Sequence, residues 1–121
     1  MLVDVSNTVS RAEPLLRVYE SKIVLNAAAS ALLELKEGSC LSFKADERET
    51  SSHVYVGNVS AARQCYPVRR RANTFFVTDS SLARKLAERL QGNGTYRISK
   101  EDNLEYSGVI YYNIFFNIND F

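Results

Sequence analysis

Hydrophobic and polar residues follow two periods along this chain, and the first complete unit that they define spans residues 22–44, KIVLNAAASALLELKEGSCLSFK. Its first four residues alternate as in a short strand, and Asn26 is a favourable helix N-cap residue. Residues 27–35 are rich in helix formers, Gly38 ends the helix, and strand-like alternation returns at 40–44. The pattern predicts a strand, a helix and a second strand in direct succession.

A second unit, FFVTDSSLARKLAERLQGNGTYRIS at residues 75–99, repeats this order. After a strand and a capping residue at Asp79 or Ser80, leucines recur at i, i+4 and i+8 while charged residues occupy the other side. The helix runs to about Leu90, Gly92 ends it, and a strand follows. This pattern is typical of an amphipathic, half-buried helix.

Three further stretches have the alternation or the apolar content of strands. LLRVYESKIVL, at residues 15–25, reads as one long strand with a break or as two short strands joined by a turn. Residues 53–56 read as a strand that ends at a two-residue hairpin turn, Gly57–Asn58. Residues 109–118 form the most apolar strand, which follows a polar loop at 100–107.

These elements predict an α+β fold, in which an antiparallel sheet of about six or seven strands carries two helices on one face. The expected order is strand, helix, four strands, helix and two strands. Residues 1–14 are polar, lack periodicity and read as a flexible N-terminal arm, whereas residues 15–121 form a single domain. The expected core consists of the inward positions of the two periods: Ile23, Leu32, Leu33, Leu41, Phe43, Val54, Val56, Leu82, Leu86, Ile110, Ile114 and Phe116.

Composition places the chain among ordinary globular domains, since 45% of its 121 residues are hydrophobic and 24% are charged. No stretch has the length of a signal peptide's apolar segment or of a membrane span, so we expect a cytoplasmic protein without membrane contact. Cys40 and Cys65 lack C-x-x-C spacing and lie in strand-like segments. This placement favours reduced, packed cysteines over a disulfide or a metal site.

Part of the first unit resembles the swapped-hairpin domain of AbrB-type transcription regulators. The resemblance covers about residues 20–57 and consists of a strand, a short helix, Leu-x-Leu-Lys-x-Gly and an alternating strand with an acidic turn, KIVLNAAASALLELKEGSCLSFKADE followed by HVYV. The chain has Leu25-Asn26 where the family usually has Ile-Pro, and Ser39 where it usually has Asp. The resemblance implies that two such units in one chain mimic the dimer that the family assembles from two chains.

Catalytic chemistry finds little support in the sequence. His53 is the single histidine, and no partner for acid–base catalysis is evident. The acidic cluster of Asp46, Glu47 and Glu49 lacks the glycine and the ligand spacing of a calcium loop. Zinc spacings and phosphate-binding loops are missing from the sequence as well. We therefore expect no enzyme, no cofactor and no bound metal.

A basic stretch is the feature that points most directly to a function. From Thr50 to Thr78 the sequence has four arginines and no acidic residue, although the net charge of the chain is only +1. Arginines interleaved with aromatic residues suit phosphate contact combined with base stacking. The predicted contact residues for nucleic acid, or for an acidic protein surface, are Arg63, Tyr66, Arg69, Arg70, Arg71 and Phe75.

Two other interpretations of the chain remain open. The arginines also suit a loop that protects a sheet edge. Alternatively, the protein is an interaction or assembly module, in which an edge strand near Pro67 and the Tyr- and Phe-rich C-terminal strand form a homodimer or partner interface. Binding to nucleic acid would weaken steeply with salt, whereas assembly would depend on protein concentration.

Overall fold

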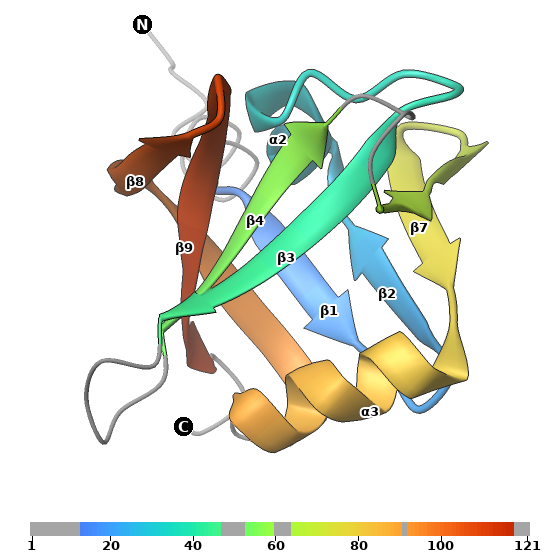
Figure 1. Cartoon of the computed structure of the whole chain (residues 1–121). Coiled ribbons are helices and arrows are strands. Elements are labelled where there is room, and N and C mark those ends of the chain that lie inside the picture. Colours follow the sequence, from blue (N-terminus) through green and yellow to red (C-terminus); the bar gives the residue numbers. More distant parts are fainter. Residues whose placement is uncertain (1–12, 47–52, 60–63, 91, 118–121) are drawn as a thin grey trace, which may run out of the picture.

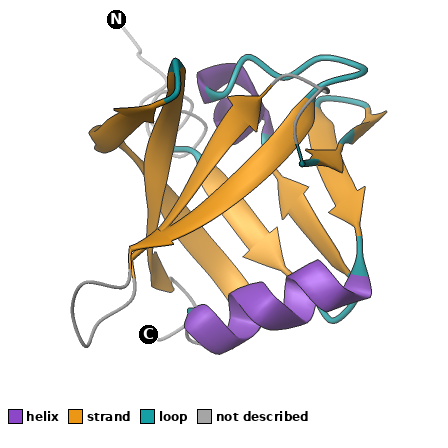
Figure 2. Cartoon of the chain, viewed as in Figure 1, coloured by secondary structure: helices purple, strands orange, loops and turns teal. Residues whose placement is uncertain are grey.

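The computed structural model describes residues 13–46, 53–59, 64–90 and 92–117. Within this part of the chain, nine strands form one antiparallel sheet in the order β5-β3-β4-β9-β8-β1-β2-β7-β6, and two helices accompany it (Figures 1 and 2). In chain order the elements are β1 Leu15–Val18, β2 Lys22–Leu25, α2 Ala27–Leu32, β3 Cys40–Asp46, β4 His53–Val59, β5 Tyr66–Pro67, β6 Arg69–Arg71, β7 Thr74–Thr78, α3 Ser80–Arg89, β8 Gly94–Tyr106 and β9 Val109–Asn117.

The sheet curls until its two edge strands nearly meet. These edges, β5 and β6, follow one another in the chain with only Val68 between them. The Val68 N–H donates a hydrogen bond of 3.0 Å to the carbonyl of Ser39, immediately before β3. Because β5 pairs with β3 and β6 pairs with β7, residues 66–71 connect the two ends of the sheet and give it a nearly closed, barrel-like shape (Figure 1).

The expectation of six or seven strands with both helices on one face is wrong. In Figure 1, α2 lies at one end of the barrel-like sheet and α3 crosses the other end. Leu82 and Leu86 of α3 are buried, as predicted, because the apolar stripe of this helix packs into the interior from that end. Each helix therefore closes one opening of the curled sheet instead of covering a flat face.

Two segments that the sequence assigns to turns or loops lie in strands. Gly57 and Asn58 belong to β4, where Gly57 makes room for the Tyr111 ring: a Cβ atom at Gly57 would lie 3.0 Å from Tyr111 Cδ2. Residues 100–106 continue β8, with an irregular register against β9 between Ile98 and Asn103. This part of β8 is polar because it projects away from the core as a hairpin arm with β9, so its composition resembles that of a loop.

Helix α2 is shorter than the pattern over 27–35 predicts. It ends at Leu32, Leu33 forms the C-cap, and Glu34 takes a left-handed φ of 54°. Its N-cap is Asn26, as expected. The chain then turns toward β3. The remaining apolar residues of 27–35 therefore pack against the core from a turn and not from the helix.

Most of the expected core is buried. Eight of the twelve residues are less than 9% exposed: Ile23, Leu33, Leu41, Val54, Val56, Leu82, Leu86 and Ile114. Leu32 and Phe43 are half-buried against this cluster. Ile110 is 48% exposed, because the β8–β9 arm carries it beyond the barrel-like body, and the side chain of Phe116 lies outside the described part.

The two strand–helix–strand units occupy related positions in the sheet. The first unit is β2-α2-β3 with β4 following, and the second is β7-α3-β8 with β9 following. The leading strands, β2 and β7, pair with each other in antiparallel fashion, and so do β4 and β9. Equivalent strands of the two units therefore meet at two places in one sheet.

The prediction of two reduced cysteines is wrong. A disulfide joins Cys40 to Cys65, with Cα atoms 5.6 Å apart and a sequence separation of 25. The reason is topological, since β5 pairs beside β3 and brings Pro67 opposite Cys40, which places Cys65 within reach. Disulfides persist mainly in oxidising compartments, so this bond removes support from the cytoplasmic expectation. Among the described helices, none is long and apolar enough to cross a membrane.

Candidate nucleic-acid interface

The three arginines of β6 lie on an exposed edge strand and divide between its two faces. Arg69 is opposite Phe76 and Arg71 is opposite Thr74, whereas Arg70 is opposite Phe75. Phe75 is buried in the core, so the side of Arg69 and Arg71 is the outer one, because opposite residues share a face and successive residues alternate. Arg70 lies at the inner rim, where its Nε donates a hydrogen bond of 3.0 Å to the carbonyl of Ala72.

The strand register shows which residues of the next three strands share the outer face of β6. Phe76 of β7 is opposite Val24 of β2, and Val24 is opposite Arg17 of β1. Arg69, Phe76, Val24 and Arg17 therefore form one row across the sheet, with an exposed arginine at each end and half-buried apolar side chains between them. In Figure 1, the three strands β1, β2 and β7 form the wall behind β3.

A tyrosine flanked by two cations completes this surface. Tyr19 directly follows β1 and is 38% exposed, and its N–H donates to the carbonyl of Lys22 at 2.9 Å. The guanidinium carbon of Arg17 lies 5.2 Å from the centroid of the Tyr19 ring, and Lys22 Nζ lies 5.3 Å from it. Both distances fall within the range of a cation–π interaction.

We name this surface the basic face and define it by six residues: Arg17, Tyr19, Lys22, Arg69, Arg71 and Phe76. The four strands that carry it, β1, β2, β6 and β7, contain five basic residues and no acidic residue. Two acidic residues border these strands in sequence: Glu20 lies in the β1–β2 turn, and Asp79 uses its carboxylate to cap α3. The basic face therefore concentrates positive charge that the net charge of the whole chain conceals.

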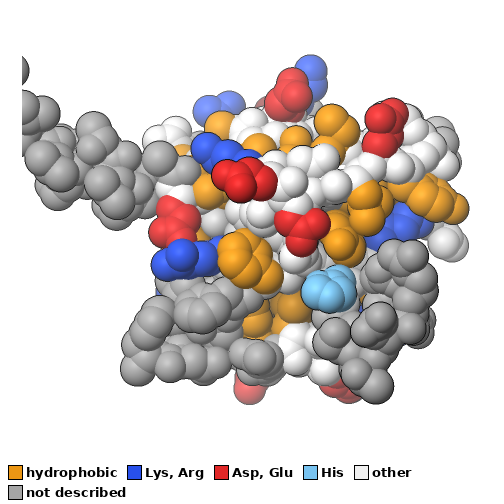
Figure 3. All heavy atoms as spheres, turned by 90° about the vertical axis from the view of Figure 1, so that its left-hand side faces the viewer, with side chains coloured by type: hydrophobic (Ala, Val, Ile, Leu, Met, Phe, Trp, Pro, Cys, Tyr) orange, Lys and Arg blue, Asp and Glu red, His pale blue; other side chains and the backbone are white. Residues whose placement is uncertain are grey.

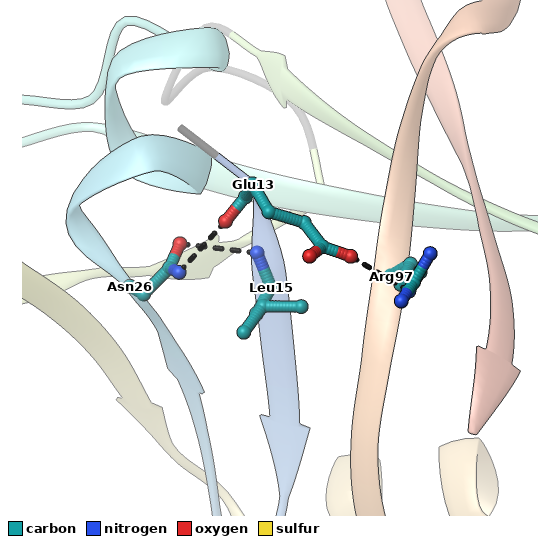
Figure 4. A network of polar contacts seen from close by, with 4 residues as sticks. All are labelled: Glu13, Leu15, Asn26 and Arg97. Atoms are coloured by element: carbon teal, nitrogen blue, oxygen red, sulfur yellow. Dashed lines mark hydrogen bonds and ion pairs between the residues drawn. The ribbon is translucent and has the colours of Figure 1, made fainter. Parts of the chain in front are cut away.

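One further cation beside this surface is already paired. Arg97 of β8 is opposite Leu15, and its Nε lies 2.6 Å from the carboxylate of Glu13 (Figure 4). The ion pair is partly exposed, so its main role is to hold the start of β1 against β8. Because the charge of Arg97 is compensated, we leave it out of the basic face.

The residues predicted from the sequence are only partly brought together. Arg69 and Arg71 lie on the basic face, and Arg70 lies on the opposite side of the same strand. Phe75 is 6% exposed and belongs to the core, so its ring offers no stacking surface. Tyr66 is half-buried on β5, with its ring centroid 6.3 Å from that of Phe43. Arg63 lies outside the described part of the chain.

Sequence reasoning missed Arg17, Tyr19 and Lys22. A weak signal existed, because Arg17 and Tyr19 are two positions apart in a strand-like stretch and so share a face. No pattern in the neighbouring sequence indicates that these residues lie near the arginines of β6, about 50 positions later. Only the pairing of β2 with β7 and of β7 with β6 places both groups on one surface.

Other kinds of site find no support in the described residues. No group of three or more His, Cys, Asp or Glu side chains among them could hold a metal ion. His53 is exposed at the start of β4, where the strand register places it opposite Asp46 of β3. Comparison of the whole chain with family models, curated proteins and solved structures found no match in any of the three.

Proposed function

We propose that the protein binds nucleic acid through the basic face. The observation that carries this proposal is the outward surface of four adjacent strands, on which β1, β2 and β6 supply cations and Tyr19 and Phe76 lie among them. A sheet surface that combines phosphate-contacting arginines with aromatic rings is a recurring solution for nucleic-acid binding. The AbrB-type resemblance, which stays a prediction, is compatible with this class of ligand.

Electrostatics determine what such binding would look like in solution. Each phosphate neutralised by a cation releases a counterion, so the logarithm of the binding constant falls by roughly 0.7 to 0.9 per contact for each tenfold rise in salt. Arg17, Lys22, Arg69 and Arg71 supply four outward cations. We therefore expect a log–log salt slope of about −3 to −4 if all four contact phosphates.

The decisive experiment uses paired arginine variants. The double variant Arg69→Gln/Arg71→Gln removes two charges from the basic face, and it should weaken binding to labelled oligonucleotides and reduce the salt slope by about two units. Arg84→Gln/Lys85→Gln removes the same charge from the exposed side of α3 and serves as the control. A single-charge comparison uses two neighbouring residues of β6. Arg69→Gln, on the basic face, should weaken binding more than its control Arg70→Gln, on the inner rim.

Fluorescence anisotropy at several salt concentrations would measure these affinities. Equal losses in the face variant and in the α3 control would show that only net charge matters, and the basic face would then not be the site. An acidic protein partner is the alternative occupant. If polyglutamate displaces the oligonucleotide as effectively as unlabelled oligonucleotide does, the surface recognises negative charge in general.

A second candidate function is homo-oligomeric assembly through the β8–β9 arm. This arm exposes large apolar side chains, with Leu104 at 38%, Tyr106 at 55% and Ile110 at 48%. Figure 3 looks onto the side where β8 and β9 lie and shows exposed hydrophobic side chains among acidic and basic ones. Apolar and tyrosine side chains of this kind are enriched at the centres of interfaces.

Light scattering across a concentration series tests this second function. If the arm mediates self-association, the wild-type mass should rise with concentration, and Ile110→Asp should abolish the rise. Ser81→Asp introduces the same charge at an exposed position of α3, away from the arm, and serves as the matched control that should leave association intact. A constant monomer mass for the wild type would exclude assembly over the concentrations tested.

A further inference from the structure

We infer that the ligand of the basic face is a single strand, with one base stacked on Tyr19; this inference rests on the proposed function. Tyr19 is the aromatic residue of the face that is most open to a ligand, because Phe76 and the neighbouring Val24 are half-buried between strands. It extends beyond the end of β1, at the turn into β2. A ring in this position is accessible without any change in the fold.

When a nucleic-acid single strand binds, a base can replace one of the two cations that contact the Tyr19 ring. Arg17 and Lys22 both lie within 5.3 Å of the ring centroid in the free protein. An exposed cation–π contact contributes about 0.5 to 1 kcal/mol, whereas a stacked base contributes about 1 to 3 kcal/mol. A base therefore displaces a cation from the ring, and the displaced cation is then close to the phosphate that follows the stacked base.

A duplex cannot make this exchange without opening, because its bases are already stacked on one another and paired. It would contact the basic face through phosphates alone. The width of the face also suits a short strand: neighbouring strands lie about 4.8 Å apart, so β1 and β6 are about 14 Å apart across three spacings. At roughly 3.4 Å per stacked nucleotide, that distance corresponds to about four nucleotides.

Variants of Tyr19 test the inference separately from the proposed function. Tyr19→Leu keeps an apolar side chain but removes the ring, and it should weaken binding of a labelled oligothymidylate of eight nucleotides by about 5- to 150-fold. The salt slope and the affinity for a duplex should stay unchanged. Tyr19→Phe retains the ring and should bind within about twofold of the wild type.

Tyr106→Leu is the matched control. Tyr106 is also an exposed, cation-flanked tyrosine, with Lys44 Nζ 5.0 Å from its ring centroid, but it lies on the β8–β9 arm. Its removal should leave affinity unchanged. A second measurement requires no variant: irradiation of the unaltered protein with a bromouracil-substituted single strand should attach the strand to the peptide that contains Tyr19.

The outcomes distinguish the two levels of the proposal. If Tyr19→Leu binds single strands as well as the wild type while Arg69→Gln/Arg71→Gln binds poorly, the basic face is the site and the stacking inference is wrong. Duplex binding as tight as single-strand binding would also overturn the inference alone. If the wild type binds neither form, both the inference and the proposed function are wrong.

Discussion

At the scale of single residues, Asn26 links more of this fold than any other polar side chain in Figure 4. Its Oδ1 accepts hydrogen bonds from the N–H groups of Ala29, at 2.8 Å, and Leu15, at 3.0 Å. Its Nδ2 donates to the carbonyl of Glu13 at 3.0 Å. One side chain therefore caps α2 and fixes the start of β1. Asp79, the cap of α3, has the simpler role, with one bond of 2.9 Å from the Leu82 N–H.

This difference predicts unequal effects of removing the two caps. Asn26→Ala should lower the free energy of unfolding by about 2 kcal/mol or more, because it removes the cap and leaves the backbone groups of Leu15 and Glu13 without their partner. Asp79→Ala should cost about 1 kcal/mol, as for an ordinary cap. Urea denaturation of both variants measures the difference, and equal losses would show that the contacts of Asn26 to β1 contribute nothing.

At the scale of elements, α3 shows where local pattern and tertiary structure agree. Its predicted extent and its buried leucines match the structure, because an amphipathic stripe of this strength has only one side that can face the interior. The β8–β9 hairpin shows the opposite case. The β8 part of its arm, residues 100–106, extends beyond the core, and its mostly polar composition concealed a strand.

The docking of α3 yields the second stability prediction. Leu86 is 3% exposed, and Leu86→Ala should lower the free energy of unfolding by about 2 to 5 kcal/mol through the lost burial and the resulting cavity. Lys85→Ala, at the exposed neighbouring position, is the control and should change it by less than about 0.5 kcal/mol. A loss under about 1 kcal/mol for Leu86→Ala would contradict the docking of α3 onto the open end of the sheet.

At the scale of the whole molecule, the disulfide lies at the place where the curled sheet closes. Cys40 is the first residue of β3, and Cys65 immediately precedes β5. Strand β5 has only two paired positions, Tyr66 opposite Leu41 and Pro67 opposite Cys40. The covalent bond therefore supports a pairing that is too short to be stable alone, and it fixes the segment from which the arginines of β6 continue.

Removal of this bond should destabilise the closed sheet. Cys40→Ala/Cys65→Ala should lower the free energy of unfolding by about 2 to 4 kcal/mol, since the bond closes a loop of intermediate length in the unfolded chain. A reducing agent should lower the melting temperature of the wild type toward that of the double variant, whose own melting temperature should not respond. A wild type that is insensitive to complete reduction would show that closure does not depend on the disulfide.

The sequence by itself determined the local features: the Asn26 N-cap, a second cap at Asp79 or Ser80, the amphipathic helix α3, the two strand–helix–strand units and eight of the twelve expected core residues. These depend on neighbouring residues, on capping geometry and on periodicity. The tertiary structure alone decided the curl of the sheet, the helices at opposite ends, the disulfide and the basic face. Each of these depends on which distant strands pair, and no local pattern specifies that β6 ends the sheet beside β7, three strands away from Arg17 and Tyr19.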